Sequence, residues 1–418
     1  MKSKTILCLM DYGKDCKTGF GTVSKNIKSE IKRHYKDDIN LHILAVNHYG
    51  ENYTEEDGTI VFSAKINDVK QDDFGRYAFI KILQDSDEYD GIFIMQDLGV
   101  ISPIMPIIQH IKEKKIAENR KQFKSIFYFP VDCNLFASLT RNLEVFDLIV
   151  TYTEFARAEV LKFRPDLKGK VKVVYHGNNP KDFYEVDKDK ALAFRKEFFG
   201  ENADKFIIIN ANRNQPRKDL PTTIFAFIEL KKTWDVKTFG KEPFLYIHAH
   251  PKDPLGHDLR ALLMQTELVE DEDYMLLPKR LEGQMATTEE LNLIYNACDL
   301  YVTTTLGEGW GLTITESMAV GLPIIAPNTT SITEISGNGT RLNLLNTIIP
   351  ICSSLDNIIR EQCDYLEVAE MIIDVATYYG WGTSNKQKDK ITKGKEFVAS
   401  ITWKQICKRW IGYFGEVY

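Results

Sequence analysis

Two glutamates, Glu308 and Glu316, have seven residues between them in GEGWGLTITESMAVGLPIIAP, residues 307–327. The first lies among glycines, and the second lies in a run whose apolar spacing predicts a helix. A carboxylate in such a loop could accept hydrogen bonds from the hydroxyls of a sugar. One about a turn into the helix could reach the two hydroxyls of a ribose. Gly309 and Gly311 would let backbone amides approach a bound group, and a helix N-terminus favours an anion such as a diphosphate.

A second interpretation of Glu316 needs no ligand. Thr313, Ile314, Thr315 and Glu316 match a capping box, in which the glutamate only closes the first turn of its helix. Both interpretations stay open at the level of the sequence.

The stretch resembles the E-x7-E signature of the retaining glycosyltransferase family 4. The resemblance covers the acidic residue, the Gly-aromatic-Gly triplet, the spacing and the Gly-x-Pro entry to the next strand. It implies the GT-B fold, in which two Rossmann-like domains face each other across a cleft. It also implies that Glu308 contacts the donor sugar and Glu316 the nucleotide ribose. The donor-binding residues expected in the motif are Glu308, Gly309, Trp310, Gly311, Leu312, Thr313 and Glu316.

Cationic residues elsewhere extend the resemblance. IINANRNQPRKDLPTTIFAF (208–227) is similar to the family's arginine–lysine segment, so Arg213 and Lys218 would clamp the diphosphate. The alternative is that both belong to a solvated loop. DYMLLPKR (273–280) corresponds to the segment that holds the nucleotide base in the family, and its candidates are Pro278, Lys279 and Arg280.

Three further candidates lie outside these segments. KTGFGTVS (17–24) resembles the family's glycine loop, with Gly19 and Gly21 leaving room for substrate, although an ordinary tight turn explains it as well. In IFYFPVDCN, Asp132 stands near the place where many family members have a histidine; it would contact the sugar or acceptor, or cap the next helix. His248 is expected to line the donor cleft.

The reaction implied by the resemblance moves a hexose from a nucleotide-diphosphate sugar to a hydroxyl, with retention at the anomeric carbon. Glu308, Arg213, Lys218 and Asp132 would carry it, because charged groups around the leaving phosphate stabilise the transition state. Mannose from GDP-mannose is the first expectation and a UDP-glucose type of donor the second. The acceptor would be a glycan, a glycoprotein or a lipid-linked glycan. A nucleotide-sugar epimerase of the same fold, a phosphorylase and a non-catalytic nucleotide-sugar-binding protein are the alternatives.

No metal or other cofactor is expected. His248 and His250 share a strand face, but no carboxylate or cysteine completes a ligand set there. The two D-x-D patterns, Asp85 to Asp87 and Asp271 to Asp273, lie in charge-rich stretches, which favours a solvated surface.

The elements that would position these residues appear as two series of short apolar runs separated by amphipathic stretches. Such runs are typical of parallel strands covered by helices on both faces. The series breaks near residues 181–190, so the prediction is two Rossmann-like domains, over 1–184 and 185–400. The resemblance implies that the first is the acceptor-side domain and the second the donor-binding domain. A C-terminal helix, about 401–418, would pack back on the first domain. The runs are TILCLM, LHILAVN, TIVFSA, GIFIMQD, SIFYFP, DLIVTYT and VKVVYHG, then KFIIINANRN, FLYIHAHP, DYMLLPK, DLYVTTT, LPIIAP and TIIPIC.

Length and composition set the outer limits. The chain has 418 residues, 44% hydrophobic and 27% charged, with a net charge of −6, which favours a soluble two-domain protein and argues against a nucleic-acid partner. No apolar run is long enough to span a membrane. Seven scattered cysteines without a CxxC pair fit reduced thiols in the cytoplasm. A homodimer is compatible with the sequence.

Overall fold

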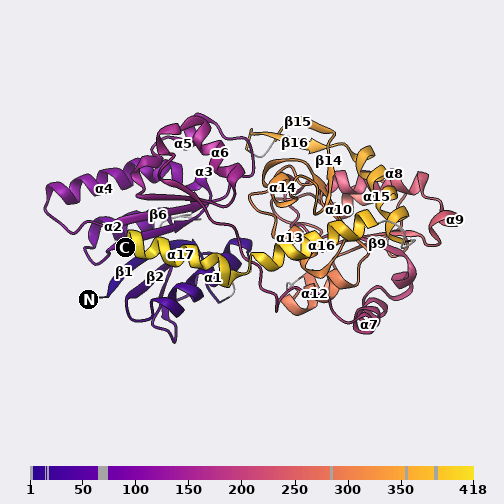
Figure 1. The fold of residues 1–418 in the computed structure, drawn as a ribbon, viewed down its shortest axis with the longest axis horizontal. Helices are drawn as coiled ribbons and strands as arrows, with labels where there is room; N and C mark the ends of the chain where they lie inside the picture. The colour runs from indigo at the N-terminus through magenta and orange to yellow at the C-terminus, as the bar shows by residue number, and fades with distance from the viewer. Residues whose placement is uncertain are drawn as a thin grey trace. The chain divides into compact units, whose positions relative to one another are not determined.

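The structure is a computed structural model that describes residues 3–14, 16, 18–64, 74–282, 286–353, 356–380 and 385–418. The chain forms two compact units (Figure 1). The first contains Met1–Gly177 and Trp403–Tyr418, and the second contains Asn178–Thr402. Each unit is an α/β structure with its own sheet and its own apolar core.

The sheet of the first unit has the strand order β3-β4-β2-β1-β5-β6-β7-β8. All pairs are parallel except β3 with β4, so β3 is an added edge strand. The seven apolar runs predicted for this half all form strands, because continuous apolar sequences suit strands buried on both faces. The strands are β1 (Lys4–Asp11), β2 (Ile39–Val46), β3 (Tyr53–Thr54), β4 (Ile60–Ser63), β5 (Gly91–Met95), β6 (Lys124–Phe129), β7 (Leu148–Thr151) and β8 (Val171–Val173).

Helices cover both faces of this sheet. Ile92 and Ile94 of β5 share a core with residues of α2 and α4, whereas Phe93 points to the other face and packs edge-on against Trp410 of α17. α17 lies beside α1 (Figure 1), where Tyr35 donates a hydrogen bond to the carbonyl of Ile411 at 2.7 Å. The C-terminal helix therefore packs on the N-terminal unit, as predicted. The helices are α1 (Gly19–His34), α2 (Arg76–Asp85), α3 (Leu98–Ile101), η1 (Ser102–Ile104), α4 (Met105–Ala117), α5 (Ala137–Thr140), η2 (Leu143–Val145), α6 (Glu154–Phe163), η3 (Pro165–Leu167) and α17 (Trp403–Val417).

The sheet of the second unit is parallel throughout, in the order β11-β10-β9-β12-β13-β14. This is the 3-2-1-4-5-6 arrangement of a doubly wound nucleotide-binding fold. Its strands are β9 (Phe206–Asn210), β10 (Pro243–Ile247), β11 (Tyr274–Leu276), β12 (Leu300–Val302), β13 (Ile324–Pro327) and β14 (Asn343–Leu345). Its helices are α7 (Lys188–Phe199), η4 (Gly200–Asp204), η5 (Pro216–Lys218), α8 (Leu220–Thr233), α9 (Val236–Phe239), α10 (Leu259–Leu263), α11 (Lys279–Glu282), α12 (Thr288–Asn296), α13 (Leu312–Val320), α14 (Thr330–Ile335), α15 (Tyr365–Gly380) and α16 (Asn385–Ser400).

One predicted strand has a different place. TIIPIC forms β15 (Ile348–Cys352), which pairs antiparallel with β16 (Ile359–Cys363) in a separate two-stranded ribbon. The sixth strand of the sheet is instead β14, which begins with the polar Asn343 and is not part of a longer continuous apolar run. β15 is apolar but largely exposed, and Pro350 within it is typical of an edge rather than a central strand.

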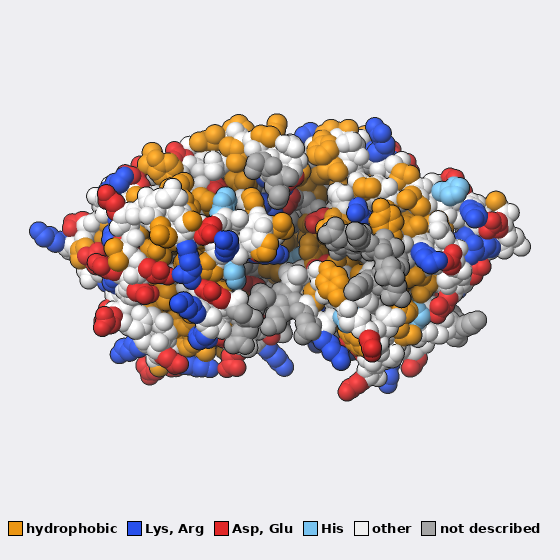
Figure 2. Space-filling model, turned by 180° about the vertical axis from the view of Figure 1, so that it is seen from behind, with side chains coloured by type: hydrophobic (Ala, Val, Ile, Leu, Met, Phe, Trp, Pro, Cys, Tyr) orange, Lys and Arg blue, Asp and Glu red, His pale blue; other side chains and the backbone are white. Residues whose placement is uncertain are grey.

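Charged side chains of both signs are interspersed over the face shown in Figure 2. Within the described residues, the structure contains no helix whose length and hydropathy would allow it to cross a membrane.

Ligands of doubly wound sheets bind beyond the carboxyl ends of the strands, where the strand order reverses. In the second unit this point lies between β9 and β12, which are neighbours in the sheet. The loop after β9 carries Arg213 and Lys218, and the loop after β12 carries Glu308. The fold therefore brings the two predicted segments to one edge of one sheet.

Candidate functional site

Glycines mark both ends of α13. Gly311, at the N-cap, has a φ of 90°, and a Cβ added there would lie 3.0 Å from Cδ1 of Ile314. Gly321, with a φ of 82°, follows the last residue of the helix, and the N–H of Leu322 reaches back to the carbonyl of Ser317 at 3.0 Å. That bond is typical of the Schellman motif. The two glycines fix where α13 starts and stops, and its N-terminus opens at the edge of the sheet where the loop lies.

The capping-box interpretation of Glu316 is wrong. The helix begins one residue after Gly311, so Thr313 lies inside its first turn and does not cap it. The Thr313 hydroxyl instead accepts a hydrogen bond from Tyr301 at 2.7 Å. Glu316 accepts one from the hydroxyl of Tyr295, on α12, at 3.0 Å.

The environment of Glu316 favours its protonated form. Burial raises its pKa from 4.5 to about 7, and the negative charge of Asp182 adds to this, while the Tyr295 hydrogen bond opposes it. Glu316 therefore exchanges its proton near neutral pH. A ligand whose hydroxyls donate to it would favour the charged form and lower its pKa.

Among the residues that the structure describes, two cationic side chains lie against the buried carboxylate of Glu308. Only 5% of the residue is exposed. Lys218 donates a hydrogen bond from Nζ to Oε1, and a guanidinium nitrogen of Arg217 lies 3.5 Å from Oε2. The same arginine donates to the carbonyl of Gly307 at 2.7 Å. Two positive charges thus meet one carboxylate beside the start of α13.

The backbone of Glu308 is held by the first two residues of α14. Its N–H donates to the hydroxyl of Thr330 at 3.0 Å, and its carbonyl accepts from the hydroxyl of Ser331 at 2.6 Å. Thr330 has a φ of 50°, a left-handed conformation that is unfavourable for a β-branched residue. Strain of this kind clusters at functional sites, so Thr330 is a residue to test in the positioning of Glu308.

Hydrogen bonds join the loop after β9 to the loop after β12. The carbonyl of Arg217 accepts from the N–H of Leu306 at 2.8 Å and from the hydroxyl of Thr305 at 3.2 Å. Deeper in the unit, the side-chain amide of Asn212 donates to the hydroxyls of Tyr301 and Thr303 at 3.3 and 3.0 Å. Since Tyr301 in turn donates to Thr313, a buried polar network connects the first loop to α13.

Several of these supporting residues were missed in the sequence. Arg217 is adjacent to the predicted Lys218, and the run of polar residues in NANRN was a signal that could have been used. The sequence around Thr330 and Ser331 contains no such signal, because their role depends on a contact with Glu308, more than twenty residues away. The missed residues are Arg217, Tyr295, Tyr301, Asn212, Thr330 and Ser331.

Arg213 does not join Lys218 on Glu308. It is paired with Asp253 through its Nε at 2.8 Å, and 57% of its side chain is exposed. The hydrogen bond from Arg213 helps to hold the pKa of Asp253 below its ordinary value against the opposing effect of burial. The structure thus separates the two predicted clamp residues.

The other donor-side candidates lie after β10 and β11. His248 follows β10, is half-buried, and its Nδ1 lies 2.6 Å from the Tyr246 hydroxyl; burial lowers its pKa to about 4, so it is neutral. Pro278 is half-buried, and Lys279 and Arg280 are exposed on α11. Arg280 forms an ion pair with Glu290 at 2.5 Å. Gly309 and Trp310 are buried, with Trp310 3% exposed, and Leu312 is half-buried.

In the first unit, neither Gly19 nor Gly21 lies in a loop or tight turn. Both belong to the first turn of α1, whose N-cap Thr18 accepts a hydrogen bond from the N–H of Gly21 at 2.9 Å. A Cβ at Gly21 would lie 2.6 Å from Sγ of Cys16, so this glycine is required by packing. Lys17, which begins the predicted segment, lies outside the described residues.

Asp132 is half-buried on the loop between β6 and α5. It does not cap the next helix, because Phe136 occupies the N-cap of α5. Its predicted contact with a sugar or acceptor stays a prediction.

The D-x-D patterns differ from each other. Asp87 is half-exposed and lies 2.5 Å from Lys115, in keeping with a surface position. Asp273 is only 6% exposed, pairs with Lys231 and accepts from the N–H of Val269 at 2.8 Å, so a solvated surface was the wrong expectation there. Among the residues that the structure describes, no group of three or more histidines, cysteines, aspartates and glutamates has the arrangement of a metal site.

Comparison with known proteins matches these features to transferases. Residues 267–350, which contain β11 to β14 and the motif loop, match the family model for glycosyl transferases group 1. A probable sucrose-phosphate synthase of Thermosipho melanesiensis is 24% identical over 201 residues, which is 46% of this chain and 41% of that protein. The chain thus matches less than half the length of this curated relative.

Solved structures resemble the whole chain in fold. A sucrose-phosphate synthase from Thermosynechococcus elongatus superposes with a TM-score of 0.69 at 13% identity, covering 99% of this chain and 98% of that one. Anabaena HepE in complex with UDP gives 0.64 at 13% identity, covering 99% and 100%. The trehalose-6-phosphate synthase OtsA gives 0.66 at 13% identity, covering 100% of both chains. The chain has the two-domain GT-B fold.

Proposed function

We propose that the protein is a retaining glycosyltransferase that moves a hexose from a nucleotide-diphosphate sugar to a hydroxyl group. The observation that carries this proposal is the position of Glu308. It is a buried carboxylate beside Lys218 and Arg217, next to the N-terminus of α13 and at the switch point of the sheet. The match of residues 267–350, which include Glu308, to group 1 glycosyl transferases supports the transfer of a glycosyl group.

Each part of the site has a role in this reaction. The N-terminus of α13 and the ammonium of Lys218 would bind the diphosphate, whose negative charge grows as the glycosidic bond breaks. Glu308 would accept hydrogen bonds from the sugar hydroxyls, and Glu316 would accept them from the ribose. Arg213 is exposed and would have to leave Asp253 to reach a phosphate, so we assign the main cationic role to Lys218 with Arg217.

For the donor, we place UDP-glucose before GDP-mannose. The solved relatives include HepE with UDP-glucose and a trehalose-6-phosphate synthase with UDP-2-fluoro glucose. GDP-mannose, the first expectation from the sequence, has no counterpart among these relatives. The acceptor would be a glycan, glycoprotein, lipid-linked glycan or free sugar, and the reaction needs no metal in this proposal.

Calorimetric titration with UDP-glucose, GDP-mannose and ADP-glucose, without added metal, tests the donor site. We expect one donor to bind and Glu316→Gln to weaken it at least tenfold, since the ribose loses a charged partner. Glu396→Gln, an exposed change on α16, is the matched control. If no nucleotide sugar binds at millimolar concentration, the proposed donor site is wrong.

A further inference from the structure

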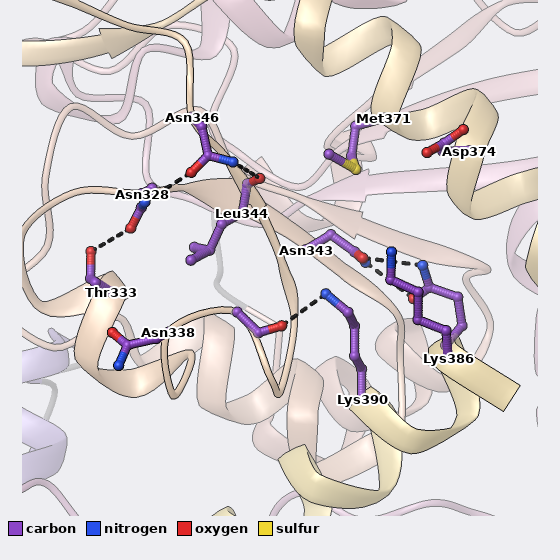
Figure 3. Close-up of a pocket in the computed structure, with 12 residues that line it drawn as sticks. Asn328, Thr333, Asn338, Asn343, Leu344, Asn346, Met371, Asp374, Lys386 and Lys390 are labelled. Carbon is purple, nitrogen blue, oxygen red and sulfur yellow. Dashed lines mark hydrogen bonds between the residues drawn. The ribbon is translucent and has the colours of Figure 1, made fainter.

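A pocket separate from the motif loop lies on the second unit, at the edge strand β14 of its sheet. Its volume is about 350 Å³, within the range of small-molecule sites. β14 forms its floor, and α14, α15 and α16 contribute the walls (Figure 3). In the sheet, β14 is separated from β12 by β13. Among the described residues, those that bond to Glu308 are Lys218, Arg217, Thr330 and Ser331, and none of these four lines the pocket.

The floor is a rigid polar surface. Asn343 on β14 and Gln387 on α16 exchange two hydrogen bonds between their side-chain amides, each at 3.1 Å. Both residues are buried, with 5% and 4% exposed. A buried reciprocal amide pair holds both side chains in one orientation, so the polar atoms beside the pocket are pre-organised.

Lys390 brings a positive charge to the wall. Its ammonium donates to the carbonyls of Gly339 and Leu342, both at 2.8 Å, which uses two of its three donors. Burial, and then the charge of Lys386 one turn earlier on α16, lower its pKa to about 8. Two ammonium groups on one side of the pocket, against the one carboxylate of Asp374 at its rim, favour an anion.

The remaining walls could bind a ligand that has hydroxyl groups and a small apolar face. Asn328 donates to Asn346 at 2.9 Å and accepts from the hydroxyl of Thr333 at 2.8 Å (Figure 3). Leu344 and Met371 add apolar surface between these polar groups. Side-chain amides, a hydroxyl and a short apolar surface are complementary to the mixed polar and apolar faces of a sugar ring.

We propose that this pocket binds a small phosphorylated sugar at a site separate from the motif loop. The phosphate would lie against Lys386 and Lys390, and the ring against the amides. A link to the motif helix is built into the packing, because Gly394 of α16 lies against Met318 of α13, where an added Cβ would be 3.3 Å from Cγ. Binding here does not require the proposed transferase activity.

Calorimetry with glucose 6-phosphate on the full chain, with glucose and inorganic phosphate as comparisons, tests the site. We expect glucose 6-phosphate to bind more tightly than either fragment. Lys386→Gln and Lys390→Gln should each raise its Kd at least tenfold. Lys393→Gln, which removes the same charge from a residue of α16 paired with Asp389, should leave it unchanged.

The pH dependence gives a second readout. Between pH 9 and pH 7 Lys390 takes up a proton, so the affinity of the wild-type protein should rise over this interval and that of Lys390→Gln should rise less. If Lys390→Gln fails to fold, as judged by circular dichroism, the exposed Lys386→Gln carries the test.

Four results would overturn the proposal. If glucose 6-phosphate does not bind at millimolar concentration, the pocket is not a site for it. Equal affinity for inorganic phosphate would show that the sugar ring contributes nothing to binding. Binding that both lysine variants leave unchanged, or that UDP displaces competitively, places glucose 6-phosphate elsewhere on the protein.

Discussion

At the scale of single residues, the site depends on two buried carboxylates in different electrostatic environments. Glu308 is buried beside Lys218 and Arg217, and Glu316 is held by Tyr295 in surroundings that raise its pKa to about 7. One carboxylate is thus paired with cations, and the other exchanges its proton near neutral pH.

Glu316 should make stability depend on pH in a defined direction. Its pKa rises from 4.5 to about 7 on folding, so between these values the folded protein holds a proton that the unfolded chain has lost. The contribution of Glu316 to stability therefore falls as pH rises from about 4.5 to 7. Urea unfolding of the wild-type protein should show this loss, and Glu316→Gln should reduce it. An identical pH dependence in both proteins would show that the environment of Glu316 is described wrongly.

Thr330 should have a strained backbone and should also hold the backbone of Glu308 in place through its hydroxyl. Thr330→Gly and Thr330→Val both remove the hydroxyl that accepts from Glu308, but only glycine relieves the left-handed backbone. We expect both to lower turnover about equally, and the glycine variant to be more stable than the valine variant by about 1–2 kcal/mol. Thermal unfolding and steady-state kinetics measure the two effects. Full activity in either variant would show that the Thr330 hydroxyl is not needed to position Glu308.

At the scale of elements, Gly321 should be required after α13 because its backbone has a positive φ, which an L side chain adopts only with strain. Gly321→Ala forces an L side chain into a φ of 82° and should cost about 1 kcal/mol. Gly412→Ala, in the interior of α17 with open space around it, should instead stabilise the protein by about 0.5–1 kcal/mol. Denaturant unfolding compares the two, and destabilisation of the same size at both positions would contradict this account.

Much of the architecture could be predicted from the sequence, because buried parallel strands show as continuous apolar runs and the motif loop shows its own turn residues. β14 could not, because Asn343, Leu344 and Leu345 are not part of a longer continuous apolar run. The capping box stayed open as an alternative for Glu316 because Thr313 fits that pattern locally, whereas in the structure Gly311 is the N-cap and excludes it. The roles of Arg213, Lys218 and Glu308 stay predictions. The pairing of Lys218 with Glu308, 90 residues apart, and of Arg213 with Asp253, 40 residues apart, depends on long-range contacts that no local pattern reports.

At the scale of the whole molecule, the chain is two units with separate cores, and α17 returns to the first after the second is complete. Trp410, fully buried against Phe93 and Tyr128, is its main anchor. Trp410→Ala should destabilise the first unit by about 3–5 kcal/mol. In differential scanning calorimetry we expect the transition of that unit to move down while the other stays. A shift of both transitions by the same amount would mean that the units unfold as one.

The central claim, that the site around Glu308 and Lys218 transfers a sugar, is tested most directly by ³¹P NMR of donor turnover with a panel of sugar acceptors. The account predicts acceptor-dependent release of nucleoside diphosphate by the wild-type protein. Lys218→Gln should lower the rate about 10²–10³-fold, as for other charged contacts to a leaving group. Lys232→Gln, an exposed lysine of α8 paired with Glu229, should leave the rate unchanged. Undiminished turnover in Lys218→Gln, or a donor that binds but is never consumed, would contradict the account.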